Sequence, residues 1–134
     1  MMNRLFTVVT IGCVMLASDA LPVAQKDLVA RYAEYSGKHV IVRGEVVSDF
    51  EMTLMYLPGA AGEQAIPEGM LIALSRQASE RPDALTKRFV KLLKKSGSVT
   101  AELEGRFEGV PDRRWGHQAC CRLRLQVDRV ISLK

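Results

Sequence analysis

Cysteine is scarce in this sequence, with three residues in 134. That number excludes a disulfide-dense miniprotein, because such scaffolds make up for a small core with many crosslinks. Charge of one sign does not dominate either, since 19 Lys and Arg stand against 15 Asp and Glu for a net charge of +4. This mild excess excludes a dedicated nucleic-acid condenser. Hydrophobic residues (48%) and charged residues (25%) occur in the proportions of a soluble globular chain, and the length allows one domain.

Recognisable catalytic motifs are absent as well. The sequence holds no G-x-S-x-G, no H-E-x-x-H, no phosphate-binding glycine loop and no C-x-x-C. His39 and His117 can act as bases, but no nucleophile is evident beside either. Asp49 and Glu51 form a carboxylate pair that suits acid–base chemistry, although carboxylates at a turn more often cap the backbone or are solvated. We therefore expect no catalytic residues, cofactor or metal, and keep a metal-dependent nuclease or hydrolase as a less favoured alternative.

Only one apolar run is long, and it lies at the N-terminus. Residues 5–17 are almost wholly apolar, but these 13 residues are too few for a spanning helix, which needs about 20. Arg4 precedes the run, and the small residues Ser18 and Ala20 follow it. This pattern predicts a signal peptide over residues 1–20, cleaved after Ala20, and a single exported domain over residues 21–134, periplasmic or secreted, without a transmembrane segment. A retained membrane anchor and a lipoprotein attached at Cys13 are the alternatives.

Cleavage would leave two cysteines, Cys120 and Cys121, which are adjacent. Neighbouring side chains on a strand point to opposite faces, so an ordinary disulfide between them would strain the backbone. The pattern favours two thiols, one of them packed in the core. The alternatives are a vicinal or intermolecular disulfide, and a metal site that also uses His117. The redox state of the pair stays open.

Two helices and five strands are predicted from the spacing of apolar residues. The first helix covers residues 23–36, and the second begins at Pro82 or Asp83 and ends at Gly97. Its apolar face comprises Leu85, Phe89, Leu92 and Leu93. Strict alternation predicts strands near residues 39–50, 54–57, 70–74, 98–108 and 121–133. Gly44 indicates a bulge or sharp bend in the first strand, and the alternation slips near Asp128, which indicates a bulge in the last.

This order of elements, β-β-β-α-β-β behind an extra N-terminal helix, is that of the OB-fold. That fold is mainly β, a five-stranded Greek-key barrel with its helix between strands 3 and 4. Residues 35–44 read Y-S-G-K-H-V-I-V-R-G, and residues 99–107 supply V-x-x-x-x-x-G-x-F before Gly116 and His117. These segments resemble the Y-x-G-K-x-V-x-V-x-G opening and the later V…G-x-F…G-H segment of small exported bacterial OB-fold-like proteins. The resemblance covers most of residues 25–133 and implies binding of oligonucleotides, oligosaccharides or proteins.

The loop between the last two strands is the first candidate site. Its candidate ligand-binding residues are Arg113, Arg114, Trp115 and His117. The two guanidinium groups can grip phosphate or carboxylate, the indole can stack on a base or sugar, and the imidazole can donate a hydrogen bond. The structural alternative is that Trp115 packs over one end of the barrel while the arginines are solvated or pair with Asp112.

A basic face on the second helix is another candidate. It comprises Lys87, Arg88, Lys91, Lys94 and Lys95, and it could contact a polyanion or anionic lipid headgroups. The alternative is a solvated face on a helix whose other side plugs the barrel.

We expect a non-catalytic binding module of the bacterial cell envelope. Its ligand would be anionic or polar: an oligosaccharide, an anionic polymer or an acidic surface of an envelope protein. The alternative is a structural or assembly protein that holds a partner chain through a barrel face or strand edge. Sequence-specific nucleic-acid binding is not expected, because export separates the protein from the genome and aromatic residues make up only 6%.

Overall fold

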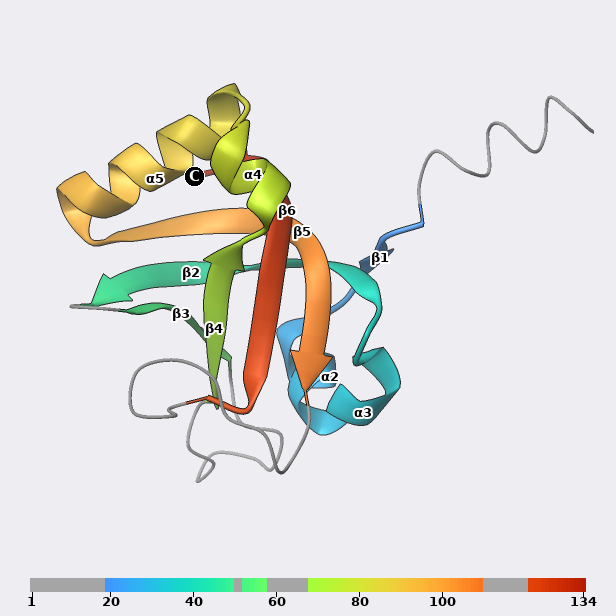
Figure 1. Ribbon diagram of the computed structural model, residues 1–134. Coiled ribbons are helices and arrows are strands. Elements are labelled where there is room, and N and C mark those ends of the chain that lie inside the picture. Colours follow the sequence, from blue (N-terminus) through green and yellow to red (C-terminus); the bar gives the residue numbers. More distant parts are fainter. Residues whose placement is uncertain (1–18, 50–51, 58–67, 110–120) are drawn as a thin grey trace, which may run out of the picture.

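Five strands close into a barrel in the computed structural model, which describes residues 19–49, 52–57, 68–109 and 121–134. The strands are β2 (His39–Asp49), β3 (Met52–Leu57), β4 (Glu68–Leu74), β5 (Ser98–Gly109) and β6 (Leu123–Leu133). They pair in the order β2-β3-β4-β6-β5, and β5 pairs back with β2 to close the barrel. The β4–β6 pairing is parallel, and the other barrel pairings are antiparallel. The protein is therefore mainly β, as predicted, with helices at two ends of the barrel (Figure 1).

Alternation decides which side chains fill the barrel. On β5, Val99, Ala101, Leu103, Gly105 and Phe107 are buried, while the residues that alternate with them are half-buried or exposed. On β6, Leu123, Leu125 and Val127 are buried in the same way. The predicted inward faces of these strands are confirmed, because a strand with one face on a core must alternate with period two.

The bulge predicted near Asp128 is confirmed. Glu104 pairs with Arg129 and the next residue, Gly105, pairs with Val127, so Asp128 is an extra residue on β6. At Gly44 the prediction of a bulge is wrong, because this residue keeps register with Ala101 without a break. The lack of room for a side chain explains why residue 44 is glycine. A Cβ atom there would lie 2.2 Å from Nε2 of Gln25 and 2.8 Å from Sδ of Met55.

Helix α5 (Ala84–Ser96) lies between β4 and β5, as predicted. The Asp83 carboxylate accepts a hydrogen bond from the Thr86 amide at its start, and Gly97 ends it with a left-handed φ of 82°. A second helix, α4 (Arg76–Glu80), precedes it and was not predicted. The Ser75 hydroxyl caps α4 by accepting from the Ala78 amide at 3.2 Å. With five residues, α4 is too short to display an apolar period.

The single N-terminal helix predicted over residues 23–36 is wrong. The chain forms α2 (Gln25–Ala30) and α3 (Tyr32–Tyr35), with a break at Arg31. Hydrogen bonds pin this segment at both ends, from Val23 N–H to the Ile41 carbonyl and from Gly37 N–H to the Phe107 carbonyl. The break at Arg31 lets this short segment contact both β2 and β5. The periodicity of the sequence cannot reveal such contacts between distant residues.

A two-residue strand, β1 (Leu21–Pro22), pairs parallel to β2 and precedes α2. It begins directly after Ala20, the expected cleavage site. Cleavage there would leave every helix and strand that the structure describes in the mature chain. Among the described residues, no helix is long and apolar enough to cross a membrane.

Candidate functional site

The leading candidate from the sequence cannot be placed. Arg113, Arg114, Trp115 and His117 lie outside the described residues. The strands on either side of them can be located, because Gly109 ends β5 and pairs with Leu123 at the start of β6. This pair lies at the end of the two strands that is remote from α5 (Figure 1). The described residues that flank this segment in the sequence, Gly109 and Cys121, are therefore not next to α5 (Figure 1).

The basic face of α5 is present and exposed. It is formed by Lys87, Arg88, Lys91, Lys94 and Lys95. Helix α5 itself contains no acidic residue, and no ion pair joins any of these five cations to the part of the chain that the structure describes. Outside α5, four arginines form an ion pair with a carboxylate, namely Arg31, Arg76, Arg124 and Arg129. Arg43, Arg81 and Arg106 form none within the described segments. We call the five residues the α5 basic face.

The opposite side of α5 explains why the basic face points outward. Phe89 and Leu93 are 2% and 8% exposed and belong to the barrel core, so burying them turns the cations toward solvent. The N-terminal cap also carries charge, since hydrogen bonds from the Thr86 amide and hydroxyl lower the pKa of the Asp83 carboxyl below 3.8. Lys94 and Lys95 lie in the last turn, where the helix dipole favours cations.

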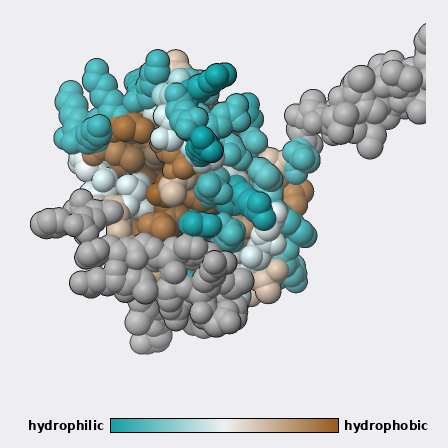
Figure 2. All heavy atoms as spheres, in the orientation of Figure 1, coloured by the Kyte–Doolittle hydropathy of each residue, from teal (hydrophilic) through white to brown (hydrophobic). Residues whose placement is uncertain are grey.

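An apolar groove runs beside the basic face. One cavity of about 450 Å³ lies between α4 and α5, and a second of about 240 Å³ lies between α5 and strands β3 and β4. Both are lined by Leu74, Val90 and Lys94, so they adjoin. We call them together the α5 groove. Figure 2 shows hydrophobic residues gathered in this region beneath the hydrophilic side chains of the helices.

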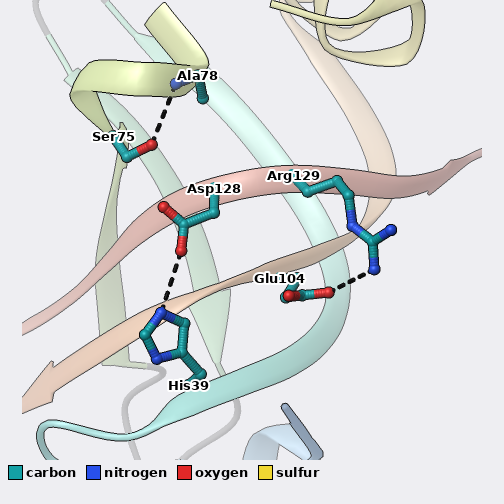
Figure 3. A network of polar contacts seen from close by, with 6 residues as sticks. All are labelled: His39, Ser75, Ala78, Glu104, Asp128 and Arg129. Carbon is teal, nitrogen blue, oxygen red and sulfur yellow. Dashed lines mark hydrogen bonds and ion pairs between the residues drawn. The ribbon is translucent and has the colours of Figure 1, made fainter. Parts of the chain in front are cut away.

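A polar network at the Asp128 bulge, next to α4, is a second feature of the structure (Figure 3). Asp128 lies 3.2 Å from Nε2 of His39, and Arg129 donates to the Glu104 carboxylate at 2.7 Å. A pocket of about 330 Å³ adjoins these residues. Arg129 and Glu104 carry opposite charges, and His39 contacts Asp128, so these contacts tie β2, β5 and β6 together at the bulge. His39 is exposed, as expected for this strand, and its near neighbour is a carboxylate.

The remaining sequence candidates give mixed outcomes. Cys121 is buried and disulfide-bonded, so it is not the free core thiol that the alternation favoured, and its partner sulfur lies outside the described residues. Cys120 and Glu51 also lie outside them, as does the side chain of Asp49 at the end of β2. Within the described segments, no group of three His, Cys, Asp or Glu residues is arranged to hold a metal ion.

Sequence reasoning missed the α5 groove because it missed α4, which forms one wall. The available signal was a helix-capping serine, Ser75, followed by good helix formers and then by Pro82. Pairing between β4 and β6 then places Leu74 beside α5, and this long-range contact has no local signature.

No protein-family model and no curated protein matches this chain. Among solved structures, the chain resembles an OBody bound to hen egg-white lysozyme, with 19% identity and a TM-score of 0.43 over 84% of this chain and 94% of the OBody. It also resembles an asparaginyl-tRNA synthetase from Entamoeba histolytica in complex with asparaginyl-adenylate, with 15% identity and a TM-score of 0.44. That match covers 87% of this chain but 24% of the synthetase. These likenesses concern the barrel fold alone.

Proposed function

We propose that this chain is an exported, non-catalytic binding module of the cell envelope, and that the α5 basic face contacts its anionic ligand. The observation that carries the proposal is the set of five exposed cations on one 13-residue helix, without an acidic residue on the helix or an ion pair to the rest of the described chain. The ligand class is the one expected from the sequence: an anionic polymer, a charged oligosaccharide or an acidic surface.

The topology supports an OB-fold-like Greek-key barrel. Strands β2 to β6 follow the OB-fold order, with α5 between the third and fourth barrel strands and a parallel pairing between the third and the fifth. The resemblance to small exported bacterial OB-fold-like proteins agrees with this assignment. OB-fold barrels serve as binding modules, although fold alone does not identify a ligand.

Electrostatics favour a ligand on the basic face over solvent alone. Lys87 and Lys91, and Lys91 and Lys95, are like charges at a spacing of four residues, and each such pair destabilises a helix by about 0.2–0.5 kcal/mol. An anion bridging these side chains removes the repulsion and adds attraction. Binding should therefore stabilise the folded chain and weaken as salt screens the charges.

The alternative function, in which a partner chain binds at a strand edge, is less well supported. Each of the five barrel strands pairs with two others, and the remaining strand, β1, has only two residues. Strand addition needs a row of unpaired backbone groups, which a closed barrel largely removes.

The test is an amide-shift NMR titration of the chain from Leu21 onward with dextran sulfate, anionic peptidoglycan fragments, single-stranded oligonucleotides and anionic vesicles. We expect saturable shifts on α5 with at least one probe. The double substitution Lys91→Gln with Lys95→Gln should weaken that binding about tenfold, since two exposed ion pairs contribute about 0.7 kcal/mol each.

The matched control is Lys26→Gln with Lys38→Gln, which removes the same charge from exposed positions away from α5. Its binding should fall by less than twofold. Equal losses in both double variants would mean that net charge alone drives binding. Shifts centred on residues 111–117 would assign the site to that loop instead, and the absence of shifts with every probe would contradict the proposal.

A further inference from the structure

The α5 groove and the α5 basic face meet at the same residues. Lys87, Lys91 and Lys94 belong to the basic face and also line the larger cavity of the groove, while Arg88 and Lys95 line neither cavity. Cations stand directly over an apolar floor that includes Leu74 and Val90. A ligand that satisfies both features needs an anionic head joined to an apolar body.

We propose that the α5 groove binds a single-chain anionic amphiphile of the fatty-acid class. This inference rests on the exposed cations of the proposed function and adds a further class of anionic ligand at the same helix. The alkyl chain would lie along Leu74 and Val90, and the carboxylate would lie among Lys87, Lys91 and Lys94.

The shape of the groove favours an alkyl chain. The cavities of about 450 and 240 Å³ adjoin through Leu74 and Val90, and the smaller continues over Ile72, Phe89 and Leu93. The larger cavity is within the range of small-ligand sites, about 300–1,000 Å³, and the smaller one extends it. A docked helix is about 10–12 Å across with its side chains, and a stable protein interface covers about 800 Å² on each partner. A linear alkyl chain needs a smaller contact area than either and can occupy both adjoining cavities.

Charge and apolar lining together distinguish this groove from the other cavities described. The residues that line its two cavities include no Asp or Glu. The pocket at the bulge is lined by Asp83, Glu104 and Asp128 as well as by arginines, so it would repel a carboxylate in part. A further cavity of about 410 Å³ on α5 also lacks acids, but Leu92 is its one apolar side chain and four cations make up the rest of its lining. The α5 groove therefore differs from the other cavities by joining cations, without competing acids, to a floor of several apolar side chains.

The exposed surface of α5 disfavours a membrane as the occupant. Interfacial helices insert bulky apolar side chains below the headgroups. Among the described residues, the large hydrophobic side chains that count as exposed are Leu21 and Tyr56, and neither lies on α5. The apolar atoms beside the lysines face a groove, which suits one dissolved chain.

The first experiment titrates the chain from Leu21 onward with sodium decanoate below its micelle concentration and follows amide shifts. We expect shifts at Leu74, Val90 and α5, and decanoate should bind at least about tenfold more tightly than hexanoate, because each fully buried methylene adds about fourfold. Decyltrimethylammonium, which has the same chain and a cationic head, should not bind. A parallel titration with vesicles of phosphatidylglycerol tests whether the protein binds a lipid surface instead of a single dissolved chain.

Groove-filling variants separate this inference from the proposed function. Ser79 is exposed on α4 and lines the larger cavity, so Ser79→Phe places a ring in the groove without disturbing the core. Ser79→Phe should lower the affinity for decanoate at least about tenfold and change the affinity for dextran sulfate by less than twofold. Ser79→Ala, the control, should leave both ligands unchanged.

Matched lysine variants test the position of the carboxylate. Lys87→Gln with Lys94→Gln removes two groove cations, and Arg88→Gln with Lys95→Gln removes the same charge from the other side of α5. Only the first double substitution should lower the affinity for decanoate by more than twofold. Equal losses of decanoate affinity in the two double variants would overturn the placement of the carboxylate among Lys87, Lys91 and Lys94.

Dextran sulfate binding on α5 without decanoate binding would overturn this inference and leave the proposed function standing. Response to vesicles alone would also overturn it. Loss of binding to every probe would contradict both proposals.

Discussion

Gly105 lies against the backbone of Gln126 and Val127 on β6, and its replacement should be the most damaging glycine substitution in the barrel. A Cβ atom at this position would lie 2.2 Å from the Gln126 carbonyl oxygen and 2.8 Å from its carbon. Cβ contacts below about 3.0 Å essentially do not occur. The obstacle is backbone, so rotation of a side chain cannot relieve the overlap.

The neighbouring strands leave little room for adjustment. Gln126 pairs with Ala73 on β4 and with Arg106 on β5, and Gly105 itself pairs with Val40 on β2. Moving β6 away would break pairings on both of its sides. Overpacking in such cores costs about 1–3 kcal/mol and at times more, so we expect Gly105→Ala to lower the free energy of unfolding by at least about 3 kcal/mol.

Two other glycines calibrate the effect in urea denaturation followed by far-UV circular dichroism. Gly69→Ala should change the free energy of unfolding by less than about 0.5 kcal/mol, because the nearest atom, in Tyr56, is 3.9 Å away. Gly44→Ala should lower the free energy of unfolding by an amount between those of Gly69→Ala and Gly105→Ala, because the side-chain ends of Gln25 and Met55 can move. A Gly105→Ala loss below about 1 kcal/mol with an unchanged m-value would refute the reasoning, because β6 would then be able to retreat.

Two further predictions concern charge. The lowered pKa of Asp83 means that its cap stabilises the fold above pH 3.8 and that this contribution is lost as the pH falls through the folded-state pKa. Asp83→Asn keeps a cap without titration, so its unfolding free energy should fall less between pH 5 and pH 2; parallel curves for both proteins would contradict this. The partly buried pair Glu108 and Arg124 should show a coupling of about 1 kcal/mol or more in a double-mutant cycle, against less than about 0.5 kcal/mol for the exposed pair Arg76 and Glu80. Equal couplings would mean that burial does not set the strength of these pairs.

Strands and the long helix could be predicted because their signals are local. Alternation along β5 and β6 marks the residues that face the core, and an interruption of that alternation marks the bulge at Asp128. Helix α5 carries its own apolar stripe, its cap at Asp83 and its end at Gly97. Each of these signals is contained within about a dozen residues.

Other features depend on residues far away in the chain. Gly44 suggests a bulge when β2 is considered alone, but its lack of a side chain makes room for Gln25 and Met55. The break at Arg31 follows from anchors on two different strands. For the candidate site, the basic face was predictable from the spacing of lysines on one helix, whereas the groove beside it was not.

The sequence by itself determined which residues face inward on β2, β5 and β6, where α5 begins and ends, and that its cations share one face. These properties follow from periods of two and of 3.6 residues, which are set by backbone geometry. Only the tertiary structure decided that Leu74 and Val90 adjoin beneath those cations and that α4 forms a wall. Closing the barrel brings together segments that share no local pattern, and the groove exists only where they meet.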